Sequence, residues 1–147
     1  MRNFIFIITA IFTLYSCGYE PQLANKKINF GFESYELYGD EKISKKILNR
    51  IIQLNDSESS NKIFIDTKLQ RSVGSKNEKG DPDTFNMTIF VKLTINNGST
   101  DKILNFKETV SYNNLDSKFE LKQYESKVEE NLSKKVSKDI FSYLAGL

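Results

Sequence analysis

The segment Phe85–Ile95, FNMTIFVKLTI, carries the most regular pattern in the chain. Six successive odd positions hold apolar residues, and polar residues stand at most of the positions between them. Alternation with a period of two predicts a β-strand with one fully buried face. The turn residues Asn96–Gly98 follow, and a second alternating run spans residues 104–112. The two runs are therefore expected to form an antiparallel hairpin.

Two further strands and a helix are expected upstream of this hairpin. Ile63–Leu69 alternates apolar and polar residues, and Phe30–Leu37 is a roughly alternating aromatic stretch in which Gly31 marks a bend or bulge. Asp40 is a suitable helix N-cap, and apolar residues then recur every three or four positions over Ile43–Leu54. The sequence thus predicts a strand, an amphipathic helix of about fifteen residues, a polar loop and a second strand.

A long amphipathic helix is expected near the C-terminal end. Ser117 and Glu120 have the spacing of a capping box, and apolar residues follow at helical spacing over Leu121–Leu144. The order of elements is therefore strand, helix, three strands, helix. Because both helices carry apolar stripes that can cover one sheet face, the predicted fold is an α+β two-layer sandwich with a mixed sheet of about four strands. The other face, with Phe64 and Phe90, is left open to water or a partner.

The composition restricts the classes of function. A chain of 147 residues fits a single domain. Its 21 Lys and Arg and 19 Asp and Glu are interspersed and give a net charge of +2, which provides no basic stripe for nucleic acid. The chain has no His and one Cys, so it has no His-based triad, no His metal site and no intramolecular disulfide. We therefore expect no cofactor, no metal and no nucleic-acid partner.

An enzymatic role is the least favoured interpretation. A hydrolase that uses carboxylates such as Glu108 and Asp116 is the alternative, but no motif places these residues as a pair and the usual general base is missing. Tyr112, Tyr124 and Tyr143 could stack on a sugar ring. Because Tyr124 and Tyr143 fall on the apolar stripe of the last helix, the expectation is that they belong to the core.

The first sixteen residues are expected to be a signal peptide. A short positive start precedes the apolar run Phe4–Leu14, which is too short for a comfortable membrane span. Leu14–Cys17, LYSC, resembles the bacterial lipobox, which predicts removal of residues 1–16 and acylation of Cys17. The alternatives are an ordinary signal peptide followed by a chance cysteine, and an uncleaved anchor.

Lipidation at Cys17 divides the rest of the chain into a linker and a domain. Residues 17–27 form the lipidated N-terminus and an extended linker, and residues 28–147 form one folded domain. Several acyl chains make membrane attachment effectively permanent. In lipoproteins of bacteria with two membranes, an Asp after the Cys often retains the protein in the inner membrane. Gly18 stands there instead and implies the periplasmic side of the outer membrane.

Cys17–Pro21, CGYEP, resembles the start of the LPS-assembly lipoprotein LptE family, which has a cysteine, a glycine, an aromatic residue, any residue and a proline. The short members from alphaproteobacteria are especially similar. Later segments agree in order and spacing: the helix over Ile43–Leu54, the strand Phe85–Ile95 with its Asn-Gly turn, and a final strand that holds Val110–Asn113. The closing segment, Tyr124–Leu144, also looks like that of the family, so the resemblance spans most of the mature chain.

This resemblance implies a lipoprotein that is not an enzyme. Its small α/β domain would sit in the lumen of the outer-membrane β-barrel LptD, as a plug and assembly aid, and would help deliver lipopolysaccharide to the outer leaflet. A globular plug needs a polar exterior in a water-filled barrel. An auxiliary lipoprotein of an ABC-type envelope lipid transporter is the alternative.

Basic residues near one predicted loop are the candidates for lipopolysaccharide contact. Residues 73–83, with two glycines and a proline, predict a long, charged and mobile loop. The phosphorylated lipid A head group requires Lys or Arg on a loop or at a sheet end. Four residues in or near this segment meet the requirement: Lys68, Arg71, Lys76 and Lys79. The alternative interpretation of the four is a solvated charged loop.

Overall fold

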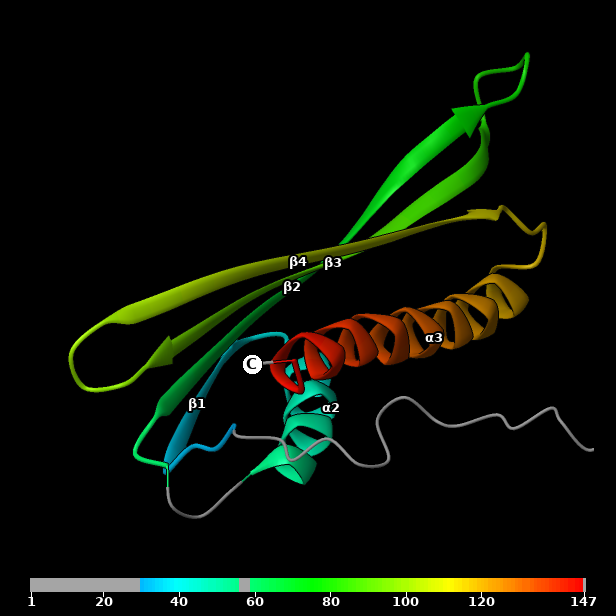
Figure 1. Ribbon diagram of the computed structural model, residues 1–147. Coiled ribbons are helices and arrows are strands. Elements are labelled where there is room, and N and C mark those ends of the chain that lie inside the picture. The colour runs from blue at the N-terminus through cyan, green and yellow to red at the C-terminus, as the bar shows by residue number, and fades with distance from the viewer. Residues whose placement is uncertain (1–29, 56–58, 147) are drawn as a thin grey trace, which may run out of the picture.

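The computed structural model describes residues 30–55 and 59–146 (Figure 1). The predicted signal peptide 1–16, the lipidation site Cys17 and the linker 17–27 lie outside the described residues. The elements, in chain order, are β1 (Ser34–Gly39), α2 (Glu41–Ile51), the 3₁₀ turn η1 (Ile52–Leu54), β2 (Lys62–Lys76), β3 (Pro82–Asn96), β4 (Asp101–Asn113) and α3 (Lys118–Leu144).

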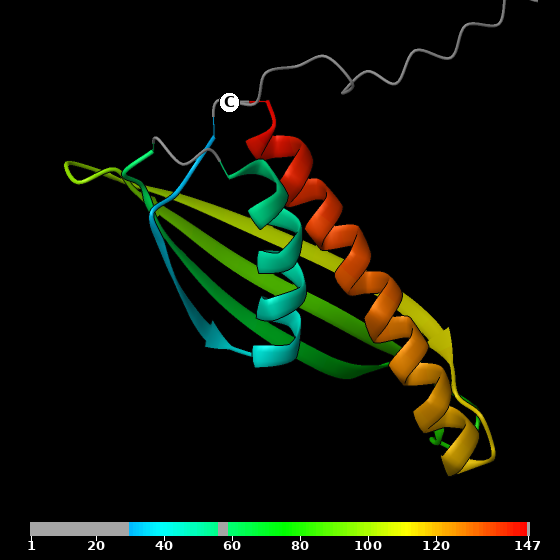
Figure 2. The ribbon, with the colours of Figure 1, turned by 90° about the horizontal axis from the view of Figure 1, so that it is seen from below.

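The four strands form one mixed sheet in the order β1-β2-β3-β4. β1 runs parallel to β2, whereas β2, β3 and β4 are successive antiparallel neighbours. α2 supplies the crossover connection that a parallel pair needs. Both helices lie on the same face of the sheet (Figure 2). The predicted α+β two-layer sandwich is therefore confirmed.

The core lies between the helices and the sheet. All six apolar residues at the odd positions of Phe85–Ile95 are at most 8% exposed, which confirms the predicted alternation. From the helices, Ile43, Ile47 and Ile51 of α2 and Val136 and Ile140 of α3 are fully buried against that surface. Each such side chain contributes about 1.5–3 kcal/mol when it leaves water, so this layer dominates the stability of the domain.

Local polar contacts fix where α2 begins. The Asp40 carboxylate accepts a hydrogen bond from the Ile43 amide at 3.0 Å, as an N-cap does. Gly39, just before it, has φ +75°, and a Cβ there would stand 1.9 Å from the carbonyl oxygen of Thr67. Only glycine fits this close approach between β1 and β2. The buried hydroxyl of Thr67 donates to the Asp40 carbonyl at 2.9 Å and so satisfies its own polar group.

The first strand is shorter than the alternation predicted. β1 begins at Ser34, and the preceding Phe30 and Phe32 are buried residues of an irregular segment. Two asparagine side chains, one just after η1 and one just before β2, form hydrogen bonds with this segment in place of a strand ladder. Asn55 Oδ1 accepts from the Phe32 amide at 2.7 Å, and Asn61 Nδ2 donates to the Gly31 carbonyl at 2.9 Å.

The prediction of a long mobile loop over residues 73–83 is wrong. β2 continues to Lys76 and β3 starts at Pro82, so only residues 77–81 form the turn. The pairing of β2 with β3 shifts register after Val73, at an irregularity that contains Gly74. The two strands therefore stay paired beyond this glycine. Since β1 pairs only as far as Thr67 of β2, the β2–β3 hairpin extends past β1 (Figure 1).

The prediction that Tyr124 and Tyr143 belong to the core is also wrong. These residues are 43% and 39% exposed, whereas Tyr112 is buried. The buried stripe of α3 runs through Val128 and Leu144, and the two tyrosines lie at its margins. There Tyr124 contacts the Tyr112 ring edge-on, with centroids 6.0 Å apart.

Candidate functional site

The sheet face opposite the helices is not covered by any described segment (Figures 1 and 2). β2 and β3 bury their odd-numbered residues, so their even-numbered residues point to this open face. The register of β4 places its odd-numbered residues on the same side. Phe64, Phe90 and Ile103 therefore lie among polar side chains on a surface that is free to meet a partner.

Three lysines surround Phe90 on this face, and we call Lys68, Phe90, Lys92 and Lys107 the open-face patch. Lys68, Phe90 and Lys107 stand in one cross-strand row, and Lys92 stands in the next. Lys107 Nζ is 5.5 Å from the centroid of the Phe90 ring. All four residues line a depression of about 350 Å³, in which Asp66 is the one acidic residue.

The charges of the open-face patch are available for a ligand. None of its three lysines forms an ion pair with a described residue, although Lys42, Lys45, Lys134 and Lys135 each do. Lysine ammonium groups bind phosphate oxygens as point charges, and an aromatic face accepts a sugar or a cation. The arrangement is therefore suited to a phosphorylated sugar.

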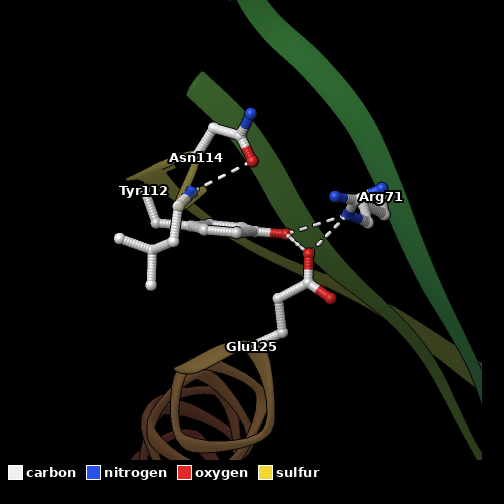
Figure 3. A network of polar contacts seen from close by, with 5 residues as sticks. Arg71, Tyr112, Asn114 and Glu125 are labelled. Atoms are coloured by element: carbon white, nitrogen blue, oxygen red, sulfur yellow. Dashed lines mark hydrogen bonds and ion pairs between the residues drawn. The ribbon is translucent and has the colours of Figure 1, made fainter. Parts of the chain in front are cut away.

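Arg71 lies on the other side of the sheet, at a contact between β2, β4 and α3 (Figure 3). Its Nε is 2.6 Å from Glu125 Oε1 and 3.1 Å from the Tyr112 hydroxyl. That hydroxyl donates to the same Glu125 oxygen at 2.7 Å. The guanidinium carbon also stands 3.6 Å above the centroid of the Phe85 ring. Arg71 thus contributes to packing on the helix-covered side.

The environment of Tyr112 raises the pKa of its hydroxyl. Burial is the main cause, and the hydrogen bond to the Glu125 carboxylate adds to it, while Arg71 acts in the opposite direction. The hydroxyl is therefore held protonated and remains a donor to Glu125. The three residues form a polar contact that joins β2, β4 and α3.

The four predicted lipopolysaccharide candidates are not brought together. Lys68 belongs to the open-face patch, whereas Arg71 faces α3. Lys76 ends β2, and Lys79 lies in the turn at the tip of the hairpin. Sequence reasoning missed Lys92 and Lys107, because a lysine between apolar strand residues is usually only solvated. Only the cross-strand register, which places both lysines beside Phe90, identifies them as part of the patch.

Glu108 and Asp116, the carboxylates named above for a possible hydrolase, both lie next to α3. Glu108 lies 2.5 Å from Lys135 of α3 in an ion pair, and Asp116 precedes the Ser117 cap of that helix. Burial, with the neighbouring Glu108, raises the pKa of Asp139.

Within residues 30–55 and 59–146, no three His, Cys, Asp or Glu side chains lie close enough together to form a metal site. In the same residues no helix has the length and apolarity to cross a bilayer.

Comparison with known proteins shows similarity to solved structures. No protein-family model matches the sequence, and no curated protein matches it. Rare lipoprotein B from Shewanella oneidensis superposes with a TM-score of 0.62 at 12% identity, covering 78% of this chain and 95% of that one.

Two further solved structures agree with the first. An uncharacterized lipoprotein B from Nitrosomonas europaea has a TM-score of 0.57 at 19% identity and covers 80% of this chain and 81% of its own. A protein described as a lipoprotein of Caulobacter crescentus CB15 has a TM-score of 0.53 at 12% identity. The match covers 76% of this chain and 88% of the Caulobacter chain. The domain described above therefore has the fold of these bacterial lipoproteins.

Proposed function

We propose that this chain is a lipid-anchored protein on the periplasmic side of the outer membrane that binds, plugs and helps assemble an LptD-like β-barrel. In this role it takes part in lipopolysaccharide transport to the cell surface and catalyses no reaction. The observation that carries the proposal is the extent of the fold likeness to rare lipoprotein B, which covers 95% of that chain. The lipobox-like LYSC and the CGYEP start at Cys17 support the same role.

The open-face patch gives this proposal a contact for lipopolysaccharide. Lys68, Lys92 and Lys107 provide positive charge beside the ring of Phe90, and no described residue forms an ion pair with them. Lipid A presents phosphates on a sugar backbone, and this chemistry matches lysines next to an aromatic face. The patch retains Lys68 from the candidates named in the sequence. Arg71 stands apart from the patch, on the helix-covered side, where its Nε contacts Glu125 and Tyr112.

Co-purification tests the barrel partner. The full chain, tagged beyond Leu147, is recovered from solubilised outer membranes, and the proteins present in equal amount are identified by mass spectrometry. The expected result is a large β-barrel at one to one. An inner-membrane transporter as the partner would overturn the proposal and support the auxiliary-lipoprotein alternative. A Cys17→Ala control removes the site of acylation and should deplete the protein from the outer-membrane fraction.

A binding measurement tests the patch separately. Replacement of Lys68, Lys92 and Lys107 by Gln should weaken lipopolysaccharide binding by about tenfold or more, since several charge-assisted contacts are lost. The matched control replaces Lys118, Lys122 and Lys138 of α3, which are exposed on the helix layer. Equal loss in both variants would mean that only total charge matters, and the patch would lose its assignment.

A further inference from the structure

β4 leaves one long edge of the sheet unpaired among the described residues. The strand has 13 residues and pairs along one side only, with β3. Among the described residues, the backbone amides and carbonyls of residues 101–113 form hydrogen bonds only with β3. An edge of this length, with no proline, presents a row of free donors and acceptors.

A cavity lies directly beside this edge, beneath the first half of α3. Its volume is about 310 Å³, and it is bounded by Thr109 and Val110 of β4. Its apolar part comes from Val110 together with Tyr124, Val128 and Leu132 of α3. Asn131 and the two lysines Lys127 and Lys135 complete the lining.

The edge and the cavity fit a single kind of ligand. A strand added to β4 would lie about 4.8 Å away, and every second side chain would point toward the helix layer. The position opposite Val110 then directs its side chain into the cavity. In β-strand addition, main-chain hydrogen bonds provide affinity and pockets for alternate side chains provide specificity.

We propose that β4 binds an extended segment of a partner protein that carries an apolar residue at the cavity position and an acidic residue near Lys127. Lys127 forms no ion pair with a described residue and selects the acidic residue, whereas Lys135 is already paired with Glu108 of β4. This inference concerns the surface itself and stands apart from the identity of the barrel proposed above.

The test uses the full chain in detergent and a defined probe. The probe is a fluorescein-labelled nine-residue peptide with Val or Leu at alternate positions, Thr between them and Glu at both ends. Fluorescence anisotropy should show saturable binding, and hydrogen exchange should slow in residues 101–113. A peptide methylated on alternate backbone amides should lose binding, because it cannot complete the ladder.

Two tryptophan variants locate the site on the protein. Asn131→Trp fills the cavity and should weaken peptide binding by about tenfold or more. Ser126→Trp places the same ring on α3 outside the cavity lining and should leave binding unchanged. Equal binding of the methylated peptide, or exchange protection on β1 in place of β4, would overturn the proposal. Protection of β4 that grows with protein concentration in the absence of peptide would do so too, because the occupant would then be a second copy.

Discussion

Arg71 and Glu125 are 54 positions apart in sequence, yet the arginine Nε lies 2.6 Å from a glutamate oxygen. The pair joins β2, at a point beyond its last partner in β1, to the first half of α3. Tyr112 of β4 bonds to both residues, so three elements meet at one polar contact. The helix is thereby attached to the part of the sheet that β1 does not reach.

Replacement of Arg71 by Ala should lower the free energy of unfolding by about 1–2 kcal/mol, measured by urea denaturation. The estimate is modest because the arginine side chain is 43% exposed and solvent screens the ion pair. Loss of the stacking on Phe85 adds to the effect. Arg71→Lys should recover only part of the stability, since an ammonium group cannot repeat the planar stack.

The matched control for that pair is Lys45→Ala. Lys45 forms an exposed ion pair with Glu41 one helical turn away. Its loss should cost at most about 0.5 kcal/mol. If Arg71→Ala and Lys45→Ala change stability equally, the contact among β2, β4 and α3 has no special role.

The carboxyl of Asp139 should destabilise the domain at neutral pH. Burial and the nearby Glu108 carboxylate raise its pKa above the ordinary 3.8, so its charged form is disfavoured in the folded state. A raised acid pKa means that stability is lost as the pH rises through that range. Asp139→Asn should therefore be slightly more stable at pH 7, by well under about 1 kcal/mol, because the carboxyl is only slightly buried and solvent screens its charge.

The gain from Asp139→Asn should vanish below about pH 3, where the carboxyl is protonated in both states. Glu130→Gln provides a control of opposite sign, because the hydrogen bond to Lys134 and its charge lower the Glu130 pKa. The Glu130 carboxylate therefore adds to the free energy of unfolding above the ordinary pKa of 4.5, and this stability is lost as the pH falls. Glu130→Gln should be less stable than the parent protein at pH 7. Chemical denaturation across pH distinguishes the two signs.

Gly39→Ala should destabilise the fold by at least about 3 kcal/mol or prevent folding. A methyl group there would lie 1.9 Å from the Thr67 carbonyl oxygen, and φ is +75°. Gly80→Ala is the control, because Gly80 also has positive φ, +86°, but has open space around it. It should cost only about 1–2 kcal/mol. Similar losses would show that the contact with β2 is unimportant.

Ile89→Ala should cost about 2–5 kcal/mol, since a fully buried side chain is removed and a cavity remains. Ile103→Ala offers the same chemical change on the open face, where the side chain is 52% exposed. It should change the free energy of unfolding by about 0.5 kcal/mol or less. A large effect at Ile103 would mean that another surface covers the open face in solution.

Much of the fold was predictable because apolar periodicity decides which residues are buried. The alternation in Phe85–Ile95 and the helical spacing of α2 and α3 correspond directly to the core. The prediction of a loop over residues 73–83 is wrong because the glycine and proline there, which usually indicate loops, are accommodated within strands. Gly74 instead allows a close approach, since a Cβ there would stand 2.7 Å from Thr84 Oγ1. Pro82 is the first residue of β3, where a strand tolerates proline.

The open-face patch was less accessible to sequence reasoning. Lys68, Phe90 and Lys107 come from three strands and meet only through cross-strand register. Spacing along the chain does not encode that register directly, because hairpin turns and bulges set it. Arg71 was identified as a basic residue, but its partner Glu125 lies on a helix whose position depends on tertiary packing.

The two kinds of strand connection have a consequence for the order of folding. β2, β3 and β4 pair with their neighbours in sequence, whereas β1 joins β2 only through the α2 crossover. Short-range pairing is reached sooner because less chain entropy is lost in closing the loop. The three-stranded meander should therefore form the folding nucleus. Leu93→Ala is expected to slow refolding, whereas Leu37→Ala in β1 should mainly accelerate unfolding.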